Sequence, residues 1–271
     1  MPDTAVRAYF VSTGPDSYDP TDHVGGAWSD EDLHVSPVVG LLAHRMELGR
    51  RVRSGDEKLL GRLSLDILGR LERGPIELET RVLRAGRTIE LVETTATISG
   101  RETLRARGWF LSPGETTPVA GTPWVPLADP ASAEPYPVAD VWPGGYIRSI
   151  EVRRLEGLQP GRGAAWLRST VDLIAGERTS DIARFIALID TANGIAVRES
   201  PESWMFPNLD LTIHFFRMPV GEWVGLDAAV SFGDAGLGLT STVLHDAHGP
   251  VGTAQQALTV RALGQPAAQT V

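Results

Sequence analysis

Hydrophobic residues recur at helical spacing between residues 179 and 194, and this stretch predicts a helix with one buried face. The apolar stripe consists of Ile182, Phe185, Ile186 and Ile189. Ser180 is a residue type that caps helix starts, and Asp181 follows in the first turn, where an acid is favourable. Asn193 and Gly194 are typical of a helix end, so we expect the helix to stop there.

Asp190 departs from this pattern. It lies at the edge of the apolar stripe, one turn from the expected end of the helix. A carboxylate at that place faces the negative end of the helix dipole and loses solvation, and both effects are unfavourable. A residue that breaks a local rule without visible compensation is a candidate functional residue, although an aspartate that turns outward into water would explain the position equally well.

The chain before residue 112 shows a strand, a long helix and then alternating segments. Ser36 and Pro37 suit the start of the helix, which is expected to end near residues 53–55. The predicted strands span residues 7–12, 63–68, 76–83, 87–99 and 103–111.

Residues 113–145 are rich in proline and have no helical or alternating period, which predicts a linker that crosses the molecule. The order of elements then repeats, with the helix at residues 179–194 in the place of the first helix. The strands predicted in this half span residues 146–153, 165–174, 209–216, 223–232, 238–245 and 252–261.

The two halves also align in sequence. Residues 62–67 match 208–213, and residues 86–111 match 236–261 without a gap, which indicates two copies of one supersecondary unit. Each copy is expected to hold a helix against an antiparallel sheet, because neither helix can bury its apolar face alone. This alignment places Asp190 near Met46, Asn208 on Arg62 and Gln256 on Ala106.

Only the second copy therefore carries an acid and two amides at these three points, which can converge at one edge of the helix. An aspartate surrounded by hydrogen-bonding groups can hold a water and take its proton, which is general-base hydrolysis. Asn208 as a turn residue after Pro207 and Gln256 as a polar residue on an exposed sheet face are the alternative interpretations.

Composition narrows the classes of function. The net charge is -9 and the pI is near 5.2, which argues against nucleic acid as the main partner. The chain has no cysteine, so disulfides, thiolate chemistry and cysteine-ligated metals are excluded. No apolar run reaches membrane-spanning length and the first residues do not resemble a signal peptide, so we expect a cytoplasmic protein without membrane contact.

Three segments resemble the acyl-CoA thioesterase II-like family, closest to its actinobacterial thioesterase-like branch. They are residues 34–43 (HVSPVVGLLA), 206–228 (FPNLDLTIHFFRMPVGEWVGLDA) and 249–258 (GPVGTAQQAL). The resemblance implies an α+β double hotdog, in which two antiparallel sheets each wrap around a central helix. It implies an N-terminal hotdog at residues 1–112, a proline-rich linker at 113–145, a C-terminal hotdog at 146–265 and a tail at 266–271.

The resemblance also implies a catalytic site. In the family a water is held by an Asp, a Thr or similar residue, and a Gln, and these roles fall on Asp190, Asn208 and Gln256. Asn208 departs from the family pattern, although an amide can donate and accept hydrogen bonds. Gln255 is one register away, so it is expected to point to the opposite sheet face.

A site for the thioester carbonyl is implied at the start of the first helix, where backbone N–H groups and the positive helix end would face the substrate. The substrate-binding candidates are His34, Val35, Ser36, Val38 and Gly40. Pro37 has no N–H, so it cannot contribute. The implied reaction is hydrolysis of acyl-CoA to free acid and coenzyme A, with no cofactor and no metal.

Two other functions remain open at this stage. One is a non-catalytic protein that binds acyl-CoA or another hydrophobic ligand, which the asparagine at position 208 favours. The other is a hotdog acyl-CoA hydratase or dehydratase, which needs an acid and a histidine near the central helix; here His44 lies in the first helix and the second has none. The acyl chain length and the pathway are not encoded in any motif, and the family is compatible with a homodimer or higher homo-oligomer.

Overall fold

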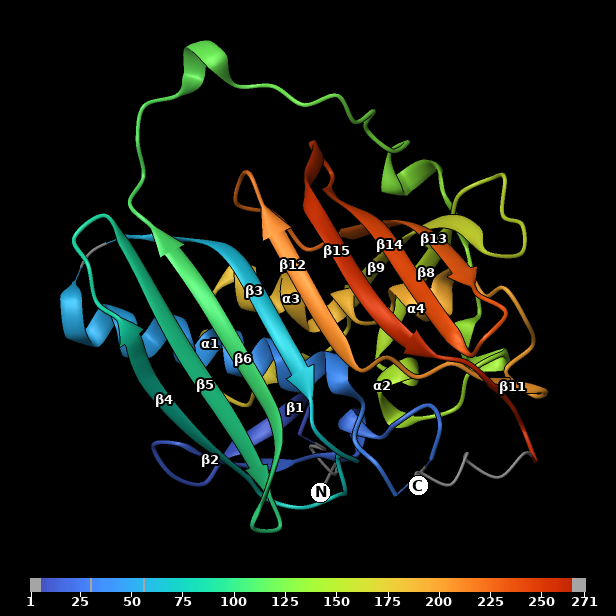
Figure 1. Cartoon of the computed structure of the whole chain (residues 1–271), viewed down its shortest axis with the longest axis horizontal. Coiled ribbons are helices and arrows are strands. Elements are labelled where there is room, and N and C mark those ends of the chain that lie inside the picture. Colours follow the sequence, from blue (N-terminus) through green and yellow to red (C-terminus); the bar gives the residue numbers. More distant parts are fainter. Residues whose placement is uncertain (1–5, 30, 56, 265–271) are drawn as a thin grey trace, which may run out of the picture.

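The computed structural model describes residues 6–29, 31–55 and 57–264, and it consists of two curved antiparallel sheets joined edge to edge (Figure 1). The strands are β1 (Ala8–Ser12), β2 (Ser17–Pro20), β3 (Leu59–Ile67), β4 (Ile76–Arg84), β5 (Ile89–Ile98), β6 (Arg101–Leu111), β7 (Glu134–Pro135), β8 (Ile150–Arg154), β9 (Arg162–Ser169), β10 (Asp172–Ile174), β11 (Trp204–Met205), β12 (Asp210–Phe215), β13 (Val224–Phe232), β14 (Leu237–Asp246), β15 (Gly249–Thr259) and β16 (Arg261–Ala262). The α-helices are α1 (Val35–Ser54), α2 (Gly145–Arg148), α3 (Asp181–Ile189) and α4 (Ala192–Ile195). The expected tail at residues 266–271 lies outside the described residues.

The two sheets form one continuous surface in the order β10-β1-β2-β4-β5-β6-β3-β12-β15-β14-β13-β9-β8-β7. The joint is the antiparallel pair β3 and β12, with Leu63 opposite Ile213 and Leu65 opposite Leu211. All four of these side chains are buried against the helices, since alternate residues of a strand point to the same face. The two halves therefore share one hydrophobic core rather than two separate ones.

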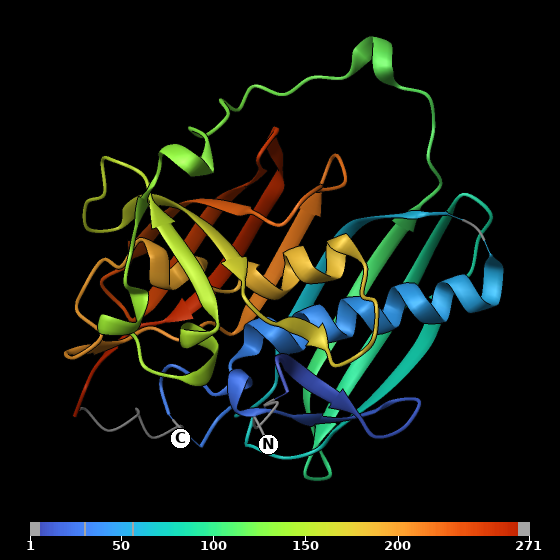
Figure 2. The same ribbon diagram turned by 180° about the vertical axis from the view of Figure 1, so that it is seen from behind.

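Helices α1 and α3 pack against each other in opposite directions on the concave side of the sheets (Figure 2). Ser180, the cap of α3, donates a hydrogen bond to Glu47 in the second half of α1, whereas Gly40 in the first half of α1 lies against Ala187 near the end of α3. A Cβ atom at Gly40 would be 2.5 Å from the Cβ of Ala187, so only glycine permits this close approach. The start of α1 consequently lies beside the end of α3.

The repeat is present, but its alignment differs by two residues from the one predicted for the strands. Equivalent strands begin 148 residues apart, at Ile76 and Val224, at Ile89 and Leu237, and at Arg101 and Gly249. The β-bulge of β3 recurs at the same offset, because Leu60 pairs with Phe110 as Asn208 pairs with Leu258. The predicted matches of Asn208 with Arg62 and of Gln256 with Ala106 are therefore wrong, and the structural counterparts are Leu60 and Gly108.

The counterpart of Asp190 remains Met46. The Sδ atom of Met46 and the Cδ1 atom of Leu60 each lie 3.1 Å from the place that a Cβ of Gly108 would take. The first half thus contains the same three-point junction of helix and two strands, built from apolar groups only.

Four local predictions were wrong, and the first two concern helix ends. His34, not Ser36, caps α1, because its Nδ1 atom accepts the Ser36 N–H at 3.1 Å and Pro37 sits in the first turn, where its missing N–H needs no partner. The helix α3 ends at Ile189, before the predicted stop, and Asn193 and Gly194 lie inside the one-turn helix α4.

The other two errors concern predicted strands. Residues 146–148 form the helical turn α2, whose first residue, Gly145, packs so closely on the backbone of Asp22 that no side chain fits there. The strand predicted at residues 165–174 is divided, and its last part, β10, leaves the second sheet to pair in parallel with β1 of the first. This exchange ties the two halves together at a second place.

The segment between β6 and β8 runs across the top of the molecule in Figure 1 and includes only short elements. Its end is anchored by β7, which pairs with β8, and by Trp142 and Tyr146, which are buried in the core. None of the helices in the part of the chain that the structure describes is long and apolar enough to span a membrane.

Candidate active site

Asp190 lies directly after the last residue of α3 and is buried, with 4% of its surface exposed. The helix tightens at this end, since the N–H of Thr191 donates to the Leu188 carbonyl at 3.3 Å, and α4 follows at once. The carboxylate is thereby held inside the molecule at the negative end of a helix, which is the unfavourable placement that the sequence indicated.

Asn208 reaches Asp190 because of a β-bulge. The bulge at Leu209 adds one residue to the strand, so Leu209 is exposed and the side chain of Asn208 turns toward the helices. Its Nδ2 atom donates to Oδ1 of Asp190 at 2.7 Å and to the backbone carbonyl of Asp210 at 3.0 Å. Asn208 is therefore not simply a turn residue after Pro207.

Gln256 points inward from β15 and is 1% exposed. Its Nε2 atom donates to Oδ1 of Asp190 at 3.0 Å and to the backbone carbonyl of Asp190 at 3.3 Å. Gln255 lies on the opposite face, where its Oε1 atom accepts the hydroxyl of Ser241 at 2.7 Å. The structure thus brings Asp190, Asn208 and Gln256 together and leaves Gln255 outside the cluster.

Both amides donate to the same carboxylate oxygen, Oδ1. Among the described residues, no group donates to Oδ2 of Asp190. Burial raises the pKa of Asp190 to about 6, while the hydrogen bonds from Asn208 and Gln256 oppose this rise. A carboxylate with one free oxygen and a pKa close to neutral has the properties of a general base.

The start of α1 lies beside this cluster, as the antiparallel packing of the helices requires. The ring of His34 lies 4.0 Å from the ring of Tyr146, and the hydroxyl of Tyr146 is 2.6 Å from Oγ1 of Thr191, the residue after Asp190. Burial raises the pKa of Tyr146, so this phenol stays protonated. His34 at the positive end of α1 is thus linked through Tyr146 to Thr191, the neighbour of the acid in the second half.

Few backbone donors remain at the start of α1. The N–H of Ser36 donates to His34 and Pro37 has no N–H, so the N–H of Val35 is left as a first-turn donor that has no acceptor among the described residues. Burial lowers the pKa of His34 to about 3, so the imidazole is neutral. Since Nδ1 accepts a hydrogen bond, Nε2 carries the proton, and His34 offers a second donor.

The other substrate-binding candidates have different surroundings. Val38 is fully buried in the core, Ser36 is buried in the first turn, and Gly40 lies in the contact with α3. His34 alone among the five candidates lines a described cavity, a small one of about 30 Å³ that also contacts Thr191. Its further walls are Ala27, Trp28, Val138, Trp142, Ile147, Asn193 and Gly194.

Aromatic side chains surround that cavity. Trp28 makes edge contacts with Trp142 and Phe206 at 5.0 and 5.3 Å between ring centroids. Phe206 lies two residues before Asn208, so one short segment supplies both an aromatic ring behind the cavity wall and the amide that reaches Asp190. Sequence reasoning missed Tyr146, Thr191 and Trp142, because they come from segments interpreted as a strand, a helix end and a linker.

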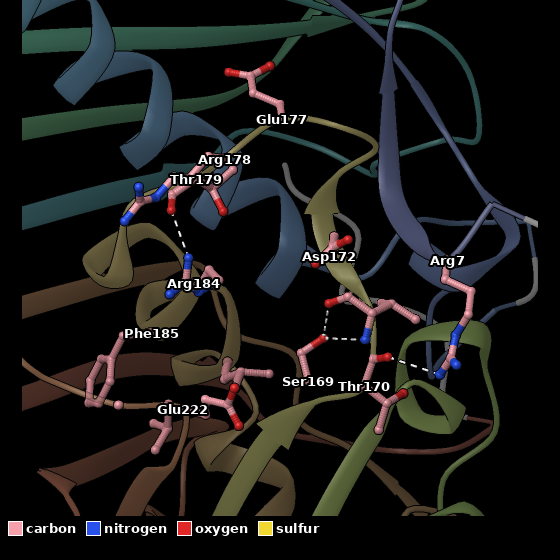
Figure 3. A pocket seen from close by; sticks show the side chains of 14 residues that line it. Arg7, Ser169, Thr170, Asp172, Glu177, Arg178, Thr179, Arg184, Phe185 and Glu222 are labelled. Atoms are coloured by element: carbon pink, nitrogen blue, oxygen red, sulfur yellow. Dashed lines mark hydrogen bonds between the residues drawn. The ribbon is translucent and has the colours of Figure 1, made fainter.

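A larger groove of about 540 Å³ lies elsewhere along α3 (Figure 3). Its charged residues are Arg7, Arg178, Arg184, Asp172, Glu177 and Glu222. Acids and bases balance, and two of the arginines are occupied, Arg7 by the carbonyl of Thr170 and Arg184 by that of Thr179. Asp190 does not line this groove, so its size does not make it the reaction site.

The fold defines a double-hotdog protein, and its buried acid cluster lies in the second half, near the start of α1. Comparison with protein families agrees: residues 25–111 match the acyl-CoA thioesterase N-terminal domain and residues 130–260 match the acyl-CoA thioesterase C-terminal domain. The chain belongs to this acyl-CoA thioesterase family, as the sequence resemblance predicted. Within the described residues no group of acidic or histidine side chains could hold a metal ion.

Solved structures support the fold. A protein of unknown function with a hot dog fold from Alicyclobacillus acidocaldarius has a TM-score of 0.73 and 15% identity, over 96% of this chain and 98% of that one. Acyl-CoA thioesterase II TesB2 from Mycobacterium marinum has a TM-score of 0.63 and 16% identity, over 94% and 96% of the two chains. The tesB protein of Mycobacterium avium subspecies paratuberculosis has a TM-score of 0.66 and 18% identity, over 93% and 96%.

These similarities confirm the predicted α+β double hotdog. Their identities are low, so they carry the fold and not the chemistry. A search of curated proteins found no match to the sequence.

Proposed function

We propose that this protein hydrolyses acyl-CoA thioesters to a free acid and coenzyme A, with Asp190 as the general base. The observation that carries the proposal is the buried carboxylate of Asp190, which receives two amide hydrogen bonds on Oδ1, keeps Oδ2 free and has a pKa of about 6. A buried acid held in this way has no structural task that an apolar side chain could not perform, as Met46 shows in the first half.

In the proposed reaction, Oδ2 of Asp190 takes a proton from a water, and the water oxygen forms a bond to the thioester carbon. Asn208 and Gln256 hold the carboxylate through Oδ1, which leaves Oδ2 available to the water. The C–S bond then breaks and the coenzyme A thiolate departs, with the proton on Asp190 available to it. No covalent enzyme intermediate is needed.

The carbonyl oxygen would be stabilised from the first half of the chain. The N–H of Val35, the Nε2–H of His34 and the positive end of α1 are the donors at the junction. A site made from both halves gives a physical reason for their fusion, because the base comes from one and the donors come from the other.

The test is release of free thiol from a panel of acyl-CoA esters that differ in chain length, with Asp190→Asn beside the wild type. Asparagine has the same shape and can still accept both amide hydrogen bonds through its oxygen, but it cannot take a proton. We expect thiol release by the wild type and a loss of about 10²-fold or more in kcat for the variant. Equal turnover by both proteins would remove Asp190 from the mechanism.

The two alternatives are separated in the same experiment. Binding of acyl-CoA without thiol release at any chain length would favour a non-catalytic binding protein.

A hydratase would need an acid–histidine pair, and the structure does contain one, His44 and Glu177, with Nε2 and Oε1 2.7 Å apart. His44 lies mid-way along α1 and Glu177 lies between β10 and α3, and among the described residues neither shares a hydrogen bond with Asp190. Water addition to an enoyl-CoA that persists in Asp190→Asn would therefore identify this pair as a separate centre.

A further inference from the structure

Beside Asp190, two buried side-chain oxygen atoms have no hydrogen-bond partner among the residues that the structure describes. They are Oε1 of Gln256 and Oγ1 of Thr240. Thr240 on β14 is paired directly with Gln256 on β15, and the two residues are 0% and 1% exposed. Paired residues of adjacent strands lie on the same face, so both side chains point toward the helices.

The orientation of the Gln256 amide is set by Asp190. Its Nε2 atom must face the carboxylate and the backbone carbonyl, because both of these accept and neither can donate. Oε1 is therefore fixed as an acceptor that points away from Oδ1. A buried oxygen that receives no hydrogen bond destabilises a fold, so two such oxygens on paired residues call for an explanation.

The equivalent positions of the first half show which side chains the fold accepts in place of Thr240 and Gln256. The counterpart of Thr240 is Val92, which is fully buried and pairs with Gly108, the counterpart of Gln256. Valine and threonine have the same shape, so the hydroxyl of Thr240 is not needed for packing.

Four neighbouring positions thus differ together between the halves. In the second half these positions are polar, and in the first half they are apolar. The pairs are Asp190 and Met46, Asn208 and Leu60, Thr240 and Val92, and Gln256 and Gly108. Three of the four polar residues already form one hydrogen-bonded cluster, and the fourth adds a hydroxyl beside it.

The next inward position on the same strand behaves differently. Thr242 pairs with Ala254, and its counterpart Thr94 is also a threonine, which pairs with Ala106. The hydroxyl of Thr242 is buried and unpartnered like that of Thr240, but no amide faces it. Thr242 therefore provides a matched control.

We propose that Thr240 binds the attacking water together with Gln256, which rests on the proposed thioester hydrolysis. The water donates one hydrogen to Oε1 of Gln256 and the other to Oδ2 of Asp190, and it accepts the hydroxyl hydrogen of Thr240. One lone pair then remains for the thioester carbon. Thr240 fixes the direction of that lone pair, and its hydroxyl neither gains nor loses a proton in the reaction.

The test compares Thr240→Val, Thr240→Ser and Thr242→Val in acyl-CoA hydrolysis. Thr240→Val should lower kcat by about 10²-fold with KM within about twofold of wild type, since the change affects the reacting water and not the acyl group. Thr240→Ser keeps the hydroxyl and should restore turnover to within about tenfold, and Thr242→Val should leave kcat unchanged. A Thr240→Val and Gln256→Ala double variant should lose no more than Gln256→Ala alone, because both act on one water.

Thermal unfolding shows that the variants are folded. Thr240→Val removes an unpartnered buried hydroxyl and should keep or raise the melting temperature. Wild-type kcat in Thr240→Val would overturn this proposal and leave thioester hydrolysis standing. A wild-type protein that releases no thiol would overturn both, and equal losses in Thr240→Val and Thr242→Val would show a packing effect and overturn the role of Thr240.

Discussion

The Nε2 atom of Gln256 donates to both the side chain and the backbone carbonyl of Asp190, at 3.0 and 3.3 Å. A single amide from the last long strand of the sheet therefore holds the carboxylate and also satisfies a carbonyl at the end of α3. The acid of the site and the end of α3 are thus held by the same side chain, and α3 stops at Ile189, four residues before the local stop signal.

Asp190→Asn should stabilise the protein at neutral pH while it abolishes activity. Burial raises the pKa of Asp190 from 3.8 to about 6, so the fold favours the protonated acid and is destabilised when the acid ionises. Above pH 6 the variant removes this penalty, which is at most about 3 kcal/mol. The gain should fade as the pH drops from 6 toward 4, because the wild-type acid is then protonated in the folded state.

Urea unfolding of both proteins at pH 8 and at pH 4.5 measures this difference. A variant that is less stable than wild type at pH 8 would show that the carboxylate is stabilising, contrary to the burial argument.

The pH profile of hydrolysis should have an acidic limb near pH 6. Activity requires ionised Asp190, so kcat/KM should rise as the pH increases through about 6. Asn208→Leu introduces the residue of the first half and removes one donor that lowers the pKa of Asp190. The midpoint of the limb should then move to higher pH, together with a fall in maximal rate. A midpoint that stays in place would mean that another group controls the limb.

Gln256→Ala and Gln255→Ala form a matched pair of adjacent substitutions. The first removes both hydrogen bonds to Asp190 and should lower kcat by about 10²-fold and the unfolding free energy by about 1–2 kcal/mol. The second removes only an outward contact with Ser241 and should change both quantities little. Steady-state kinetics and urea unfolding check this, and equal losses in the two variants would indicate a general effect on β15.

Gly40→Ala and Gly49→Ala test the packing that aligns α1 with α3. A methyl group at Gly40 would lie 2.5 Å from the Cβ of Ala187 and 2.9 Å from the Ala183 carbonyl, so the helices must separate. We expect a loss of about 1–3 kcal/mol in stability and lower activity, because His34 and Val35 would move away from Asp190. At Gly49 the nearest atom to the added methyl is the flexible end of Arg53 at 3.4 Å.

Gly49→Ala should accordingly be neutral or stabilise the helix by up to about 1 kcal/mol. If Gly40→Ala instead matches Gly49→Ala in stability and kinetics, the close approach of the two helices is not what sets the site.

The sequence alone determined the repeat, the two central helices, most strands and the anomaly at Asp190. Period and burial are local properties, because an apolar stripe or an alternating strand must face a core wherever that core lies. The same logic placed Gln256 and Gln255 on opposite faces, since the side chains of a strand alternate. The comparison of the two copies, together with the family resemblance, nominated Asp190, Asn208 and Gln256 as one group, although the copies were aligned two residues out of register.

Tertiary structure decided how those residues meet. The bulge at Leu209 turns Asn208 inward. One additional residue cannot be recognised from the alternation of polar and apolar residues in so short a strand. The cap by His34 and the early end of α3 depend on partners that are distant in the chain or on an unusual capping side chain. Thr240 becomes a candidate only because it is paired with Gln256 on the neighbouring strand. This pairing is a long-range contact that cannot be read from the sequence of either strand.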